Sequence, residues 1–89
     1  MSELTIATRN LKDDVGNSRT FHYAITVDLL DGETISLENY GVHIWEEAGP
    51  SVQVRRITTS ASRIDELLTL LVDNLVGPAA AEDVIADWL

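Results

Sequence analysis

The sequence contains no cysteine, only two histidines and two prolines, and few basic residues. Without cysteine the chain cannot form a disulfide framework, a thiolate nucleophile or a Cys-ligated zinc or iron–sulfur site. Six Lys and Arg stand against fifteen Asp and Glu, which gives a formal net charge of −9. Phosphate contacts need Lys and Arg, and an anionic membrane repels an acidic surface, so we expect neither a nucleic-acid partner nor a membrane partner.

Long hydrophobic runs are also missing. The longest apolar stretch, Leu67 to Val76, is interrupted by Asp73 and Asn74 and is too short to span a bilayer. The opening Met1-Ser2-Glu3 lacks the basic region that begins a secretory signal. We therefore expect a cytoplasmic protein, and 89 residues suit one domain covering residues 1–89.

The first 58 residues alternate between apolar and polar positions, which is typical of strands with one buried face. The clearest row places apolar residues at every second position from Phe21 to Leu29. Turn-forming residues separate the alternating segments. The pattern predicts strands at about residues 3–9, 19–29, 33–46 and 51–58.

The turn after Leu29 is predicted from the way its flanking apolar rows match. A two-residue loop would set Val27 opposite Ser36, whereas a three-residue loop of Leu30-Asp31-Gly32 sets Val27 opposite Ile35. Directly paired residues share a face, so we expect the three-residue loop. After Leu37 the apolar positions change parity, which leaves two alternatives open. Either a bulge near Tyr40-Gly41 absorbs the change, or His43 and Trp45 face inward.

The last 30 residues change to helical spacing. Ile64, Leu67, Leu68, Leu71, Val72 and Leu75 fall on one arc of a helix at about residues 60–75. Pro78 suits the first position of a second helix, predicted at about residues 78–88. The fold class is therefore α+β: an antiparallel meander of about four strands with two C-terminal helices packed on one face.

Several short segments of the second half occur together in a recognisable order: Tyr40-Gly41-Val42, Ile57-Thr58, Leu67-Leu68, Leu71-Val72, and Val76-x-Pro78 followed by Asp83-Val84-Ile85-x-Asp87-Trp88-Leu89. Through these segments, residues 40–89 resemble a family of small uncharacterised bacterial proteins, a domain of unknown function. The resemblance implies a domain of strands followed by helices. It implies no activity, and it carries over no functional residue.

Few residues are candidates for chemistry. His22 lies on the polar side of its strand and is interpreted as a surface histidine, whereas His43 lies near Trp45 and is either a packing residue or a ligand-binding one. The spacing shows no phosphate-binding glycine pattern, nucleophile motif or metal-ligand pattern, so we expect no catalytic residues, no cofactor and no metal. Tryptophan and arginine are common at interfaces, so a contact surface is predicted at Trp45, His43, Arg55 and Arg56.

Three functions remain open on the sequence alone. The favoured one is a small non-enzymatic protein-interaction or regulatory domain, whose partner is another protein or a second copy in a homodimer. The first alternative is a small-molecule-binding or catalytic domain around His43 and nearby carboxylates. The second alternative is an acidic mimic of nucleic acid, which the charge of −9 permits.

Overall fold

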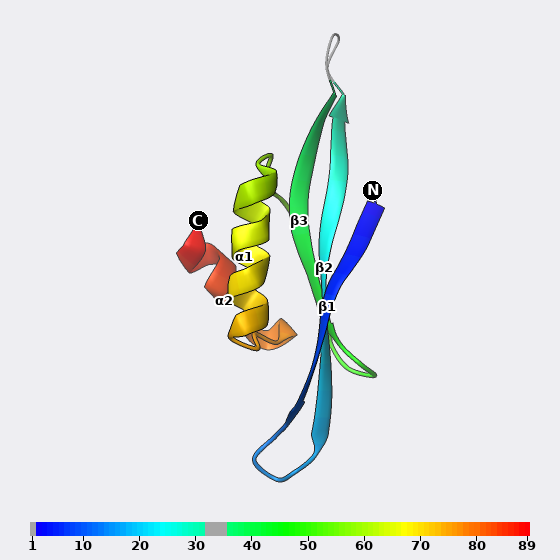
Figure 1. Cartoon of the computed structure of the whole chain (residues 1–89), viewed down its shortest axis with the longest axis vertical. Helices are drawn as coiled ribbons and strands as arrows, with labels where there is room; N and C mark the ends of the chain where they lie inside the picture. The colour runs from blue at the N-terminus through cyan, green and yellow to red at the C-terminus, as the bar shows by residue number, and fades with distance from the viewer. Residues whose placement is uncertain (1, 32–35) are drawn as a thin grey trace.

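The computed structural model describes residues 2–31 and 36–89, which form four strands followed by two helices (Figure 1). The strands are β1 (Ser2–Lys12), β2 (Ser18–Asp31), β3 (Ser36–Glu46) and β4 (Ser51–Thr58). They pair antiparallel in the order β1-β2-β3-β4, and α1 (Ala61–Asp73) and α2 (Pro78–Trp88) follow. The predicted meander with two C-terminal helices is confirmed.

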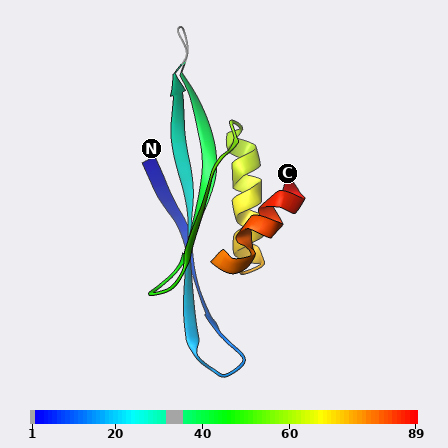
Figure 2. The same ribbon diagram turned by 180° about the vertical axis from the view of Figure 1, so that it is seen from behind.

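Both helices lie on the same side of the sheet, as the two opposite views show (Figures 1 and 2). The apolar side chains of β2 and β3 that face them are buried, notably Tyr23, Val42 and Ile44. From α1 they meet the row containing Leu67 and Leu71. One apolar layer between sheet and helices therefore forms the core. Neither helix of the described chain is long and apolar enough to cross a membrane.

The predicted register of the β2–β3 hairpin is wrong. Val27 lies opposite Tyr40 and Ile25 opposite Val42, and Asp31 pairs with Ser36, so the loop is longer than the predicted three residues. The reason is that β3 carries two apolar rows of opposite parity. The row that begins at Val42 is matched to the buried row of β2, because that register fills the core beneath the helices. The predicted turn position of Gly32 lies outside the described residues.

The pairing of β3 with β4 is irregular beside Gly41. Val42 pairs with Val54, but Tyr40 pairs with Thr58, so Gly41 alone faces three residues of β4. Arg56, in the middle of these three, has a left-handed φ of 59°. The predicted bulge in β3 does not form: the β2–β3 register is unbroken, Leu37 pairs with Leu30 on the face opposite to Val42, and the extra residues beside Gly41 belong to β4. Since Val42 and Ile44 face the helices, His43 and Trp45 face away from them.

The helical layer is shorter than the sheet that it covers. α1 has 13 residues and is about 20 Å long, whereas β2 has 14 residues and extends over about 46 Å. The β2–β3 hairpin consequently continues beyond the N-terminal end of α1 (Figure 1). The helix side of this part carries Val27 and Leu29, and the same apolar row continues through Ile25, which packs against the core, to Leu4 on the edge strand β1. We call these four residues the overhang. Leu4 is 62% exposed and Leu29 is 64% exposed.

Candidate functional site

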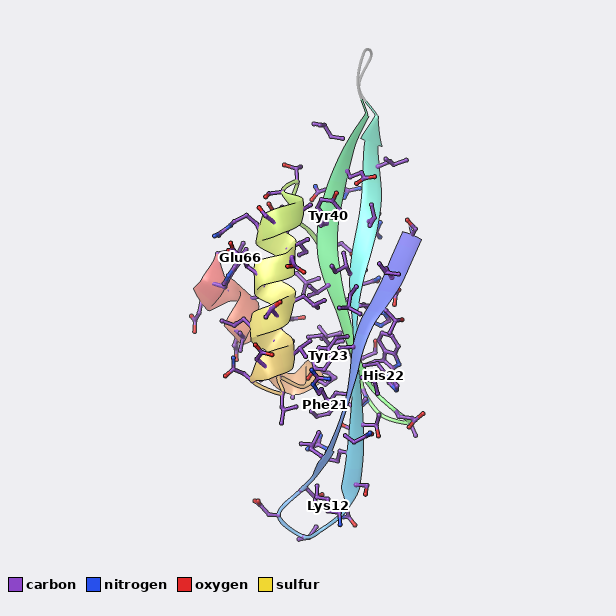
Figure 3. All side chains as sticks on the ribbon, viewed as in Figure 1. Lys12, Phe21, His22, Tyr23, Tyr40 and Glu66 are labelled. Carbon is purple, nitrogen blue, oxygen red and sulfur yellow. The ribbon has the colours of Figure 1, made fainter. Side chains whose placement is uncertain are left out.

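The helix-free face of the sheet carries three stacked rings. His22 on β2 and His43 and Trp45 on β3 point to the same side, because His22 is the register partner of Trp45. The ring of Trp45 lies 5.1 Å from that of His22 and 4.5 Å from that of His43, measured between centroids. Figure 3 shows His22 on the side of the sheet opposite the helices. The indole therefore packs against both imidazoles, and these contacts restrict the rotation of both histidines.

The His43 ring also connects two other strands through hydrogen bonds. Its Nδ1 lies 2.7 Å from Oε1 of Glu3 on β1, and its Nε2 lies 2.8 Å from Oγ of Ser51 on β4. A carboxylate only accepts hydrogen bonds, so Nδ1 donates to Glu3, and in the neutral imidazole Nε2 then accepts the hydroxyl proton of Ser51. We call this chain of Glu3, His43 and Ser51 the relay. The side chains of Glu3 and His43 are 30% and 23% exposed.

The register of the sheet explains how the relay forms. β1 and β3 are about 10 Å apart with β2 between them. The β2 residue beside His43 is Ala24, which is too small to separate Glu3 from the imidazole and is fully covered. On the other side, Ser51 pairs with Trp45 and is the diagonal neighbour of His43. Diagonal neighbours lie within reach of a long side chain.

An ion pair lies further along the same face. Arg55 donates two hydrogen bonds to Asp28. One comes from Nε, which lies 3.0 Å from Oδ2, and the other comes from the terminal nitrogen Nη2 to Oδ1. The Asp28 side chain is nearly buried, and the hydrogen bonds from Arg55 hold the pKa of its carboxyl below the ordinary value. The pair spans β3 at the position where Gly41 leaves room above the sheet. It fixes the irregular part of β4 to β2.

The structure places the sequence-predicted residues in three different settings. His43 and Trp45 lie together, as their spacing suggested. Arg55 forms an ion pair with Asp28, and Arg56 is exposed within the bulge. Their role as a contact surface stays a prediction. His22 was interpreted as a surface residue but is half-buried. Its Nδ1 shares a hydrogen bond with Oγ1 of Thr8.

Sequence reasoning missed Glu3 and Ser51. They are 40 and 8 residues from His43 along the chain, and no motif joins them. The pairing register of three strand pairs is the only signal that brings them together. Among the described residues, no three His, Asp or Glu side chains gather closely enough to hold a metal ion.

The fold and this face define a two-layer α+β domain with one uncovered sheet surface. The chain belongs to a family of unknown function, DUF6514, whose model matches residues 2–89. The match includes the first two strands as well as the segments that carried the resemblance. No curated protein and no solved structure matches the chain. The family relationship therefore supports the domain but gives it no activity.

Proposed function

We propose that the protein is an interaction domain that self-associates through the overhang. The observation that carries this proposal is that the apolar row of β2 continues past the end of the helical layer. Leu29 is more than half exposed there and Val27 is half-buried. Beside them Ile25 is half-buried at the edge of the core, and Leu4 on the edge strand β1 is more than half exposed. A contiguous exposed apolar patch on a small protein marks an interaction surface.

Shape supports the need for a partner. The molecule measures 55 × 24 × 17 Å and exposes 5560 Å². A folded monomer of its mass exposes roughly 5,200 Å². The excess agrees with a sheet that extends beyond its own covering layer.

Charge favours a second copy as that partner. A twofold interface brings the same patch of both chains together, so the patch must be complementary to itself. The helical layer does not meet this condition, because residues 57–89 contain six acids and one base. The four overhang residues carry no charge, and the carboxylate directly beside them is Glu38, the register partner of Leu29, which accepts a hydrogen bond from the hydroxyl of Tyr40. Two chains of charge −9 therefore bring fewer carboxylates together at the overhang than at the helical layer.

The free energy gained by burying Leu29 in a dimer gives the size of the effect expected in the test. Full burial of a leucine stabilises by about 1.5–3 kcal/mol, and 64% of this side chain remains exposed. Covering it in both copies contributes about 2–4 kcal/mol, equivalent to roughly 30- to 900-fold in the dimer Kd. Leu29→Glu removes this contribution and places two carboxylates in the contact.

The test is sedimentation equilibrium over a range of protein concentrations. We expect the wild type to form dimers, and Leu29→Glu and Leu4→Glu to shift dissociation to concentrations at least 30-fold higher. The matched control is Leu89→Glu, at a leucine that is 73% exposed but lies at the end of the helical layer, and it should dimerise as the wild type does. A wild type that stays monomeric throughout, or a dimer insensitive to both overhang variants, would overturn the proposal.

Two other expectations stay predictions. One is a contact surface around Trp45, which is less favoured because the indole ring already packs against His22 and His43 and is only partly exposed. The other is a cytoplasmic location, which is expected from the sequence alone. Substituting Trp45 in the same sedimentation experiment separates the two candidate surfaces, since Trp45 and Leu29 lie on opposite faces of the sheet.

A further inference from the structure

The relay has the hydrogen-bond order of a nucleophile with its general base. The hydroxyl of Ser51 lies 2.8 Å from Nε2 of His43, and the Glu3 carboxylate at 2.7 Å keeps the proton on Nδ1. With Nδ1 protonated, the Nε2 lone pair is free to take the proton of Ser51. This is the arrangement by which a histidine activates a serine hydroxyl, and such arrangements are recognised by geometry and not by sequence order.

The surroundings hold the relay in place before any substrate arrives. Trp45 packs against His43 and is itself stacked with His22, so the imidazole that would act as base is restrained by its neighbours. Ala24, the register partner of His43, is fully buried. The three side chains come from three strands of one sheet, and side chains on a paired sheet are positioned more rigidly than side chains on loops.

We propose that Ser51 is a nucleophile that accepts an acyl group, with His43 as its general base and Glu3 as the positioning residue. Ser51 Oγ attacks the carbonyl carbon of an activated ester or thioester, and the hydroxyl proton passes to Nε2 of His43. The bond between the carbonyl carbon and the leaving group breaks, and the leaving group departs with that proton. The acyl group remains on Ser51 as an ester, so neither oxidant nor further reactant is required.

Charge and shape indicate the class of acyl group. The chain carries a net charge of −9, which repels anionic donors. Glu3 adds an acidic side chain to the relay itself, on the Nδ1 side of the imidazole. The relay lies on a sheet face, which does not enclose a long acyl chain. A small uncharged acyl group such as acetyl therefore fits best, and the measurable event is one acylation per chain.

The experiment uses p-nitrophenyl acetate as the probe. We expect a burst of p-nitrophenolate equal to the protein concentration, and peptide mass mapping should place the acetyl group on Ser51. Ser51→Ala should abolish the burst. Ser18, which is also exposed on a strand, is the internal control and should remain unmodified. Circular dichroism of each variant confirms that the fold is retained.

The other two residues are tested by conservative variants. General-base catalysis contributes about 100- to 10,000-fold, so His43→Gln should slow acetylation of Ser51 by at least 100-fold. Glu3→Gln should slow it by at least about 10-fold, because an amide can donate to Nδ1 and stabilise the wrong tautomer. A merely structural role of Glu3 would not change the ¹⁵N signals of His43, whereas the positioning role predicts a shift of the proton from Nδ1 to Nε2.

Two results would overturn this assignment. One is acetylation of Ser51 that is no faster than that of Ser18, or that proceeds equally in His43→Gln and Glu3→Gln. The other is an acetyl group on His43 with Ser51 unmodified. Neither result bears on self-association, because the overhang lies on the other face of the sheet.

Discussion

Replacing Gly41 with alanine tests the packing that fixes β4 against the sheet. A Cβ at this position would lie 2.7 Å from Cα of Arg55 and 2.7 Å from Oγ1 of Thr26, and it would come still closer to the backbone oxygen of Val54. Two of these three atoms belong to the backbone of β4, so no side-chain rotation relieves the contact. The strands β3 and β4 would have to separate where the bulge lies.

The expected loss is large for a chain of this length. Overpacking of a well-packed site costs about 1–3 kcal/mol and occasionally more, and the backbone contacts place Gly41→Ala at about 3 kcal/mol or above. Domains of 89 residues have a free energy of unfolding of roughly 4–13 kcal/mol. A loss of 3 kcal/mol corresponds to a fall in Tm of about 12–24 °C.

Thermal and urea unfolding followed by circular dichroism measure this loss. Gly16→Ala is the control: it has a φ of +85° but no atom within 4 Å of an added Cβ, so it should cost only about 1 kcal/mol for the left-handed backbone. A Gly41→Ala variant as stable as Gly16→Ala would refute the reasoning, since the close approach of β4 would then not exist.

Two further predictions concern buried polar groups. Tyr23→Phe should lower the free energy of unfolding by about 1–3 kcal/mol in urea denaturation, because it leaves unpaired the buried Val76 carbonyl to which Tyr23 now donates at 2.9 Å. The hydrogen bonds from Arg55 lower the pKa of Asp28 in the folded chain. The ion pair therefore stabilises the fold above the ordinary pKa of 3.8, and this stabilisation is lost as the pH falls through the lower pKa of the folded chain. The stability difference between wild type and Asp28→Asn should therefore be largest near neutral pH and shrink below about pH 4, and an equal difference at both pH values would contradict it.

Much of the fold could be predicted because burial imposes a period on the sequence. The alternation from Phe21 to Leu29 and the helical arc from Ile64 to Val72 correspond to strand and helix in the structure. The β2–β3 register could not be predicted, because both apolar rows of β3 offered a plausible match to Val27. Only the position of the helices decides between them, since the row under α1 is the one that becomes buried.

The relay was beyond prediction for a different reason. His43 and Trp45 are two residues apart and therefore share a strand face, which local spacing shows. Glu3 and Ser51 approach His43 only through the register of strands that neighbour it in space. The register of Glu3 depends on the irregularity after Thr5 in β1, and that of Ser51 on the turn between β3 and β4; a shift of one residue would turn either side chain to the other face.

One sheet carries both proposals because alternate residues point to opposite sides. Leu4 lies next to Glu3 in β1, yet the leucine belongs to the overhang and the carboxylate to the relay. The helix-side row is apolar because it continues the core, and where the helical layer ends it leaves a surface that association can bury. No helix covers the helix-free row, and its polar side chains hydrogen-bond to one another across the strands. Self-association and acylation thus rest on separate rows of side chains, and the failure of one leaves the physical basis of the other intact.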